Sequence, residues 1–511
     1  MSAPTRIVEL EQKNALLTSE LSSVKQQLDW LKRQLFGEKS EKRLDIDPAV
    51  QGNLLSTLGV EPPPAKAADT ETITYQRRKK NRDNALNDSG LRFSEDVPRE
   101  VFVLKDPEME ALASDQYEII GEKVSHRLAQ RPGSYLVLEY HRLVYKRLDN
   151  QKVITTQAPA NVLEKSSTDV SLLAGMLIDK FCYHLPLYRQ HQRLLQAGIQ
   201  LSRTSLSNWT GSAIGLLEPI VDAQYQHILL SKVLAMDETP IKAGIQKKGK
   251  MRQAYLWPMY GEDDEIVFRY APSRAHRYVR DWLKDYRGTL LSDGYEAYAA
   301  YAKHNDQVIH AQCWSHCRRK FEQAKDQEPE ASAEALALIG AMYRHEDIIR
   351  KQQLSGADKL AYRTQHIEPV ARAFWEWRDQ QCQRPELLPK NPLSTALKYA
   401  QNRYASLQVF LSDPEVPIDT NHLERALRPV PMGRKNWLFC WTEIGAERVG
   451  IIQSLLVTCK LHGIDPYTYL VDVLQRISIH PASRVIELTP REWKIKFSHD
   501  PMKSDLALAK Q

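Results

Sequence analysis

Two apolar segments near the middle of this 511-residue chain end on an aspartate. Residues 232–236 lead into Asp237, and residues 288–292 lead into Asp293. Between them lie two further segments with strand composition and one with the spacing of an amphipathic helix, at residues 254–260, 266–270 and 279–286. The sequence therefore predicts three consecutive strands, a helix and a fourth strand, with the first and the last strand each delivering a carboxylate.

This order of elements predicts an α/β ribonuclease-H-like catalytic domain, in which the two aspartates lie at adjacent strand ends. Divalent magnesium, or manganese, is a hard cation that prefers carboxylate oxygens. Two such ions roughly 4 Å apart promote in-line phosphoryl displacement and need about three carboxylates, of which we expect Asp237 to bridge both ions. Taken singly, each aspartate is better explained as a turn residue, since Asp293-Gly294 is an ordinary turn dipeptide.

Glu424 is the predicted third carboxylate, on a helix whose apolar face carries Leu423 and Leu427. Glu424 and Arg428 share another face, where the plainer explanation is a surface pair worth only tenths of a kcal/mol. In the functional interpretation, this helix presents Glu424 to the metal ions. The basic residues that would then contact scissile or flanking phosphates are Arg425, Arg428, Arg434 and Lys435.

The N-terminal segment carries apolar residues alternately three and four apart between residues 7 and 35, with Asn14 in the one gap. This narrow heptad seam predicts a coiled coil over residues 1–44 that forms a parallel homodimer or a higher oligomer. An amphipathic helix packed on its own domain is the alternative. Residues 45–100 follow as a linker whose basic run, residues 77–82, either lies along phosphates or keeps the linker soluble.

Residues 101–165 predict a small β-containing module with turn signals such as Pro132-Gly133. The module contains no cysteine, and His126 and His141 have no partner at metal-ligand spacing, so we expect no zinc there.

Residues 166–220 are typical of a helix-turn-helix DNA-binding domain, because a glycine-containing turn and a serine cap precede a helix with a polar, basic first turn. Arg189 and Arg193 on the preceding helix could hold phosphates. Similar turns are common in proteins that never bind DNA. The residues expected to face DNA are Arg203, Thr204, Ser205 and Asn208.

The remaining segments complete the predicted organisation. Residues 221–320 and 411–450 form the catalytic domain, which is interrupted by a helical insertion over residues 321–410. Residues 451–511 form a C-terminal helical domain. The insertion carries Trp375 and Trp377, which we interpret as core residues rather than as platforms for a flipped base.

Bulk properties set the broad class. The chain is 42% hydrophobic and 26% charged, and no apolar run approaches the roughly 20 residues that a membrane span needs. The six scattered cysteines suit a reducing compartment, and the N-terminus lacks an export signal, so we expect a cytoplasmic protein without a membrane partner. The net charge of +6 only weakly favours polyanion binding.

Several motifs in order resemble the insertion sequence 66 transposase family, over nearly the whole chain. They occupy residues 35–37, 185–190, 236–240, 292–295, 313–321, 421–437 and 480–484. The resemblance implies an Asp-Asp-Glu transposase that uses Asp237, Asp293 and Glu424 with two Mg²⁺ or Mn²⁺ ions. Such an enzyme binds double-stranded DNA at the terminal inverted repeats and at the target, and companion proteins of the element could assist it.

The resemblance also bears on Cys313 and His316. Related transposases place a Cys-x-x-His just after the second aspartate, which implies a packing role or a DNA contact for these residues. Zinc binding with Cys317 and His310 is the competing interpretation, but the four residues are too crowded for usual ligand spacing. Family members commonly carry a cysteine-rich zinc module before the helix-turn-helix, and the cysteine-free residues 100–163 depart from that pattern.

Two rival functions remain from the sequence alone. A catalytically silent DNA-binding repressor or accessory protein of the element would need only the zipper, the basic linker and the helix-turn-helix. A nuclease of the same fold would cut without joining, because hydrolysis and strand transfer use one site. The three carboxylates favour a transposase over the repressor.

Overall fold

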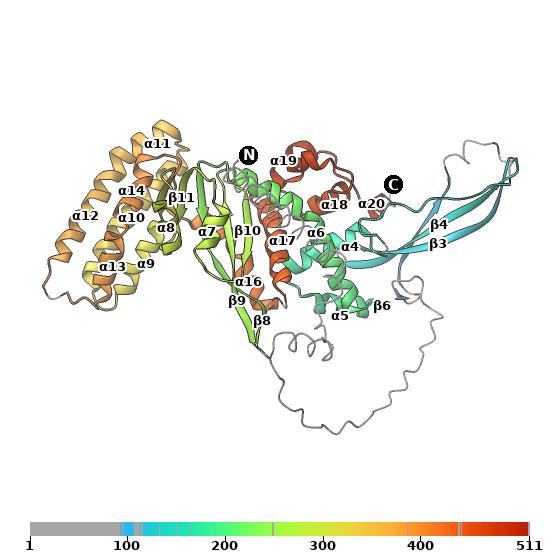
Figure 1. The fold of residues 1–511 in the computed structure, drawn as a ribbon, viewed down its shortest axis with the longest axis horizontal. Helices are drawn as coiled ribbons and strands as arrows, with labels where there is room; N and C mark the ends of the chain where they lie inside the picture. Colours follow the sequence, from blue (N-terminus) through green and yellow to red (C-terminus); the bar gives the residue numbers. More distant parts are fainter. Residues whose placement is uncertain are drawn as a thin grey trace, which may run out of the picture.

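The computed structural model describes residues 92–508, apart from short gaps at residues 94, 96, 107–112, 114–115, 132, 150, 165, 248–249, 386, 438–439 and 441. The predicted coiled coil and nearly all of the predicted linker lie outside the described residues. The described part is elongated, with a β arm at one end, a mixed core in the middle and a helical insertion at the other end (Figure 1).

The central sheet has six strands, and we call it the catalytic sheet. Its strands are β7 (Val233–Met236), β8 (Thr239–Lys247), β9 (Lys250–Tyr260), β10 (Ile266–Ala271), β11 (Gly288–Ser292) and β12 (Val308–Gln312). The order is β10-β9-β7-β11-β12, with β8 paired to β9, and β7, β11 and β12 run parallel. This is the predicted succession of strands with two additions, because the prediction missed β8 and β12.

Helices cover the catalytic sheet and explain why its inner strands are apolar throughout (Figure 1). The helices α6 (Arg203–Ile228) and α17 (Glu443–Leu461) pack against β10, whereas α8 (Glu296–Lys303) packs against β11 and β12. A Cβ at Gly450 would lie 2.4 Å from the carbonyl oxygen of Phe268, so glycine lets α17 approach β10 closely. Next to α8 lies the short helix α7 (Arg277–Trp282).

The predicted helix-turn-helix region contains α4 (Val170–Phe181), α5 (Leu187–Gln196) and the first part of α6. Between α5 and α6, the strand β6 (Ile199–Gln200) pairs with β1 (Arg92–Phe93). The helix α6 continues beyond the predicted boundary at residue 220, despite an internal proline, because its second half is buried against the catalytic core. One continuous helix therefore joins the two regions.

The insertion is helical, and its helices are α9 (Trp314–Ala324), α10 (Pro329–Lys351), α11 (Gly356–Tyr362), the π-helix η1 (Arg363–Ile367), α12 (Glu368–Cys382), α13 (Pro392–Gln401) and α14 (Tyr404–Ser412). The side chains of Trp375 and Trp377 are buried in its core, as the sequence predicts. The fully buried guanidinium of Arg363 donates to Glu346, to a carbonyl group in the last turn of α14 and to two carbonyl groups just after that helix. This ties the insertion to the segment that returns to the core.

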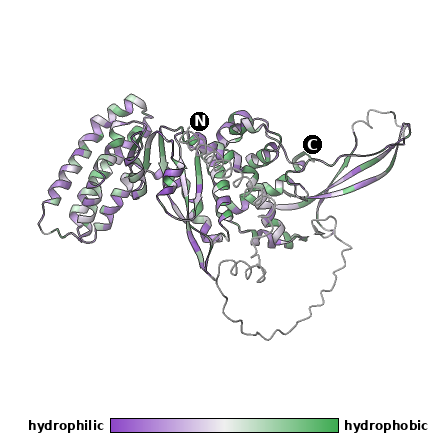
Figure 2. Ribbon diagram, in the orientation of Figure 1, coloured by the Kyte–Doolittle hydropathy of each residue, from purple (hydrophilic) through white to green (hydrophobic). Residues whose placement is uncertain are grey.

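The β arm consists of β2 (Arg99–Leu104), β3 (Tyr117–Arg131), β4 (Ser134–Arg147) and β5 (Val153–Thr155), in the order β2-β4-β3 with β5 paired to β4. It projects from the core on the side away from the insertion (Figure 1). Its strands carry hydrophilic and hydrophobic residues along their length (Figure 2). Asp505, on α20 (Asp505–Leu508), accepts hydrogen bonds from Arg127 and Tyr140 and fastens the base of the arm.

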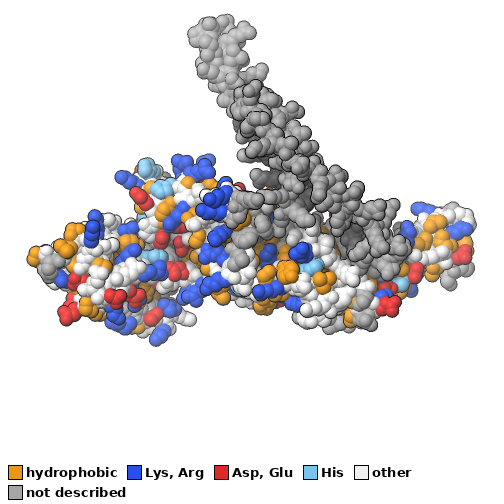
Figure 3. All heavy atoms as spheres, turned by 90° about the horizontal axis from the view of Figure 1, so that it is seen from below, with side chains coloured by type: hydrophobic (Ala, Val, Ile, Leu, Met, Phe, Trp, Pro, Cys, Tyr) orange, Lys and Arg blue, Asp and Glu red, His pale blue; other side chains and the backbone are white. Residues whose placement is uncertain are grey.

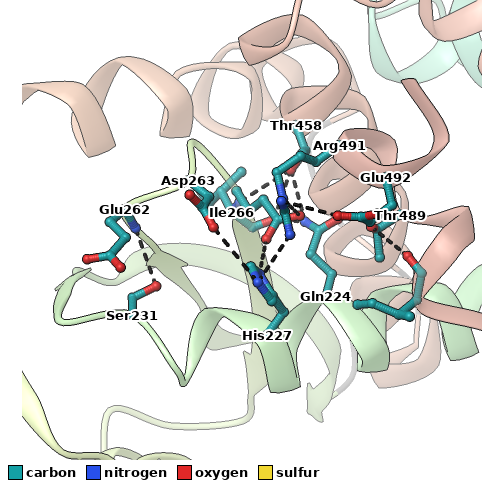
Figure 4. A network of polar contacts seen from close by, with 12 residues as sticks. Gln224, His227, Ser231, Glu262, Asp263, Ile266, Thr458, Thr489, Arg491 and Glu492 are labelled. Atoms are coloured by element: carbon teal, nitrogen blue, oxygen red, sulfur yellow. Dashed lines mark hydrogen bonds and ion pairs between the residues drawn. The ribbon is translucent and has the colours of Figure 1, made fainter. Parts of the chain in front are cut away.

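The C-terminal segment contains α18 (Pro466–Arg476), the 3₁₀-helix η2 (Ala482–Leu488) and α19 (Pro490–Lys496). A polar network attaches it to the core (Figure 4). His227 donates from Nδ1 to the buried Glu265 over 2.6 Å, while Arg491 donates to His227 Nε2 and to Glu265. Among the described helices, none is long and apolar enough to span a membrane.

Candidate active site

Asp237 and Asp293 are the first residues after two neighbouring parallel strands, β7 and β11. Met236 and Ser292, the last residues of these strands, are register partners. Parallel strands in register end at the same edge of a sheet, so each aspartate leaves its strand beside the other. The structure thus brings together the two aspartates that the sequence predicts, while their role as metal ligands stays a prediction.

Glu238, which the sequence did not single out, forms an acidic group with the two aspartates. Oxygen atoms of Asp237, Glu238 and Asp293 all lie within 4.8 Å of one another, and among the described residues these three could hold a metal ion. A regular strand would point Glu238 away from Asp237. Here β7 has already ended at Met236, and the backbone N–H of Glu238 donates to Asp237 Oδ1 over 2.7 Å. The only sequence signal was the adjacency of two acids.

Glu238 is also held by two neighbours. Its side chain is only 2% exposed, and it accepts hydrogen bonds from Tyr298, at 2.8 Å, and from Arg274. Arg274 in turn lies over the ring of Tyr295, with its guanidinium carbon 4.0 Å from the ring centroid. The carboxylate of Glu238 therefore contacts Arg274 and Tyr298 and also lies beside the two aspartates.

The acidic group carries more negative charge than its neighbours balance. Burial, together with repulsion from Asp293, raises the pKa of Asp237 to about 6. The same two causes, in the same order, raise the pKa of Glu238 to about 7. Carboxylates crowded in this way are stabilised by a bound cation.

Contacts from three elements fix Asp293. The backbone N–H of Tyr295 donates to Asp293 Oδ1 over 2.8 Å, and Gln312 at the end of β12 donates to the Asp293 carbonyl. From the insertion, Arg403 donates to the carbonyl of Gly294 over 2.9 Å. A Cβ at Gly294 would meet Tyr399 and Arg403 closer than side chains pack, so glycine permits this contact. The insertion therefore supports the residue that follows the second aspartate.

Glu424 lies on α15 (Asn421–Leu427) and outside the group of three. Its Oε1 is 3.8 Å from His316 Nε2 and 3.9 Å from Arg319, and its side chain is 32% exposed. Its charge nevertheless acts on Asp237, whose pKa it helps to raise. The third predicted carboxylate thus faces the site from a helix and is held by cationic side chains of α9.

Cys313 connects α9 to α15. Its sulfur accepts hydrogen bonds from the backbone and the hydroxyl of Thr420, at 3.3 Å each, and its residue is 2% exposed. This burial favours the packing role, and a DNA contact at Cys313 stays a prediction. For His316, burial lowers the pKa, but hydrogen bonding to Cys313 and the charges of Asp293 and Glu424 outweigh it and raise the pKa.

Of the four basic residues after Glu424 that were predicted to contact phosphates, three are exposed and one is engaged within the protein. Arg425, Arg428 and Lys435 are exposed on α15 and α16 (Pro429–Trp437), or at their junction. Arg434 instead donates to the carbonyl of Pro240 and joins α16 to β8, and burial lowers its pKa. Lys and Arg side chains gather over the middle of the face that Figure 3 shows.

At the start of α6, Arg203, Thr204 and Asn208 are exposed, whereas the half-buried Ser205 is engaged by the cap residue Ser202. On α4 and α5, Arg193 pairs with Asp179 at 3.3 Å, and Arg189 is exposed. Three of the four side chains that were expected to face DNA are thus accessible.

Comparison with known proteins gives three family matches. The family described as "Transposase IS66 family" matches residues 165–448, and "IS66 C-terminal element" matches residues 454–491. "Transposase C of IS166 homeodomain" matches residues 23–101, which include the second half of the predicted coiled coil. The first match alone covers more than half of the chain.

Three similar proteins come from Sinorhizobium fredii. Uncharacterized protein y4hP is 28% identical over 91% of this chain and 88% of its own length. Uncharacterized protein y4qI is 30% identical, with 74% and 72% covered, and Uncharacterized protein y4jD is 29% identical, with 94% and 96% covered. The predicted resemblance is confirmed: this chain belongs to the IS66 transposase family, with an N-terminal leucine zipper, an Asp-Asp-Glu catalytic domain of ribonuclease-H-like core and a C-terminal element.

Proposed function

We propose that this transposase binds the terminal inverted repeats of its element and catalyses metal-dependent cleavage and strand transfer, with Asp237, Asp293 and Glu424 as its catalytic carboxylates. The observation that carries the proposal is the meeting of Asp237 and Asp293 at the ends of β7 and β11, in an acidic group whose charge is unbalanced. Family membership supports it, because transposases of this type generally use divalent metal ions.

The carboxylate oxygens of Asp237 and Asp293 suit Mg²⁺ or Mn²⁺, which accept oxygen ligands and borrow the rest from water and phosphate. When bound, a pair of such ions activates the attacking oxygen and stabilises the leaving oxygen of an in-line displacement. Asp237 would be one of the carboxylates that hold these ions. Glu238 would orient Asp237 through its backbone N–H and balance Arg274.

Glu424 would supply the remaining carboxylate from the facing helix. His316 and Arg319 hold it at the edge of the site, and Cys313 and Thr420 fix the start of α15. The exposed Arg425 and Arg428 follow on the same helix and its end, where they would grip phosphates beside the scissile bond.

End recognition would rest on the start of α6, where Arg203, Thr204 and Asn208 are exposed. The N-terminal zipper would join two copies, so that both ends of an element are held together. Because α6 continues into the catalytic core, a DNA segment bound at its start would have a fixed position relative to the carboxylates.

The test is magnesium-dependent cleavage and joining of an oligonucleotide duplex that carries the element's end. We expect Asp237→Asn, Asp293→Asn and Glu424→Gln to abolish both steps while the duplex is still bound. The matched control is Asp285→Asn, an exposed acid just before β11, which should behave as wild type.

The outcomes separate the rival functions. Equal activity of wild type and Asp237→Asn would refute the catalytic assignment. Cleavage without joining would favour a nuclease, and binding without any cleavage by the wild type would favour a repressor or accessory protein.

A further inference from the structure

A groove between α7 and α8 lies beside the acidic group and has so far been given no role. Its cavity has a volume of about 540 Å³. The cationic side chains that line it are Arg277, Arg280 and Lys284, and none of the described residues that line it is acidic. All three are exposed.

The groove follows from the residues on the two helices. Arg277 and Arg280 are three positions apart on α7, so they share one face of the helix. The opposite wall is α8, where Ala297 and Ala300 present small side chains at the same spacing. Larger residues at these two positions would fill the space. The small side chains leave a hollow that cations border on one side.

The cations are only weakly balanced within the protein. Arg280 lies 3.6 Å from Asp281, but both side chains are more than half exposed, so this pair contributes little. Arg277 donates to the hydroxyl of Tyr278, which is a neutral partner. Like charges gathered on one helix face cost stability, and a bound anion would offset that cost.

A short chain of contacts links the groove to the acidic group. His276, at the mouth of the groove, packs edge-on against Tyr295, with ring centroids 5.6 Å apart. The backbone N–H of Tyr295 donates to Asp293. Two contacts, from His276 to Tyr295 and from Tyr295 to Asp293, therefore connect the groove to a predicted catalytic carboxylate. The groove is formed by elements other than α15, which carries the basic residues described above.

We propose that this groove binds the phosphate backbone of the DNA segment that continues from the scissile phosphate, with Arg277, Arg280 and Lys284 as its contacts. The inference rests on the proposed function and extends it, because it assigns the DNA a second exit path besides α15. Cations on a shallow, carboxylate-free groove fit phosphates without reading base sequence.

The test compares Arg277→Gln/Arg280→Gln with the matched control Arg287→Gln/Lys303→Gln, which removes two exposed cations nearby that do not line the groove. The probe is the duplex oligonucleotide carrying the element's end, bound by the full-length protein with Asp237→Asn to prevent cutting. We expect the groove variant to bind about tenfold more weakly near 0.1 M salt. Its plot of log affinity against log salt should be shallower by about two, because each phosphate contact contributes roughly 0.9.

Ethylation interference locates the lost contacts. In the groove variant, interference should disappear at phosphates within a few nucleotides of the scissile bond on one side, and it should persist in the control. An unchanged salt slope and interference pattern in the groove variant would overturn the proposal, even if the wild type cuts and joins DNA normally. If the wild type never cuts but only the groove variant loses salt-dependent binding, the proposed function fails and the groove assignment stands.

Discussion

The carboxylates of the catalytic sheet and those of the β arm differ in how their charge is balanced. On the arm, Glu139 accepts hydrogen bonds from His126 and His141, and His141 also donates to Glu122 over 2.9 Å. Burial raises the pKa of Glu139, but the bonds from His141 and His126 outweigh it and lower the pKa. At Asp237, burial and repulsion from Asp293 outweigh the backbone N–H of Glu238 and the charge of His316, and the pKa rises to about 6.

A cluster of acids on a sheet therefore does not by itself indicate a site for a cation. The arm cluster already contains its counter-charges, since both ring nitrogens of His141 contact carboxylates and raise its pKa. It stabilises the arm. In the catalytic cluster Glu238 is paired with Arg274, but Asp237 and Asp293 repel each other, and this excess charge is what a metal ion would balance.

The largest expected effect is on DNA cleavage, which should depend on the catalytic cluster and not on the arm cluster. Asp293→Asn should reduce DNA cleavage at least about 1,000-fold, since several kcal/mol of transition-state stabilisation would be lost. Glu139→Gln should leave cleavage within about threefold of wild type in the same oligonucleotide assay. A comparable loss from Glu139→Gln would mean that the arm cluster also belongs to the catalytic machinery.

The catalytic sheet and the sheet of the β arm also differ in how far their apolar side chains are buried. Leu290 on β11 is fully buried, whereas Val103 on β2 is 58% exposed. Leu290→Ala should lower the free energy of unfolding by about 2–5 kcal/mol through a cavity in the core. Val103→Ala should change it by no more than about 0.5 kcal/mol. Chemical denaturation measures both, and a large loss from Val103→Ala would show that another surface covers the arm.

The two clusters should also respond with opposite signs when one carboxylate is neutralised. Glu139→Gln should destabilise the protein by about 1–2 kcal/mol, because His126 and His141 lose a charged acceptor. In metal-free protein, Asp237→Asn should raise the thermal midpoint, because it relieves repulsion from Asp293. Calorimetry in the presence of a chelator checks the signs, and a loss of stability in Asp237→Asn would show that the acidic group is already balanced.

A smaller effect is expected in the pH dependence of metal-free stability. The pKa of Asp237 is about 6 and that of Glu238 about 7, both above the ordinary values, so the folded state binds more protons than the unfolded state between about pH 4 and 7. Their contribution to stability should therefore fall as pH rises through this window. The raised pKa of His141 acts in the same direction, above its ordinary value of 6.5.

Two controls separate these contributions. Glu238→Gln should flatten the fall between pH 5 and 7, and added Mg²⁺ should restore stability at pH 8 in the wild type more than in Asp237→Asn. Below about pH 4.5 the arm should lose stability, because Glu139, whose pKa is lowered, becomes protonated there. Identical profiles for wild type and Glu238→Gln would contradict the assignment of the fall to the acidic group.

Particular residues show how far sequence reasoning reached. Asp237 and Asp293 could be predicted to meet, because each follows a short apolar strand and parallel neighbours end together. The position of Glu238 beside these aspartates could not be predicted, because it depends on the turn between β7 and β8. The sequence pattern did not reveal β8. For Cys313 the sequence leaves packing and DNA contact open, and its burial against Thr420, which only the structure shows, favours packing.

The family, the two strand-end aspartates and the helical insertion could be predicted from the amino-acid sequence, because these depend on local periodicity and on motifs that lie close along the chain. Which distant groups meet depends on the tertiary structure. It placed Arg403 of the insertion on Gly294, His316 beside Glu424, and cations along the groove of α7. Such contacts join residues separated by many positions, and they arise from the packing of whole elements, which no local pattern encodes.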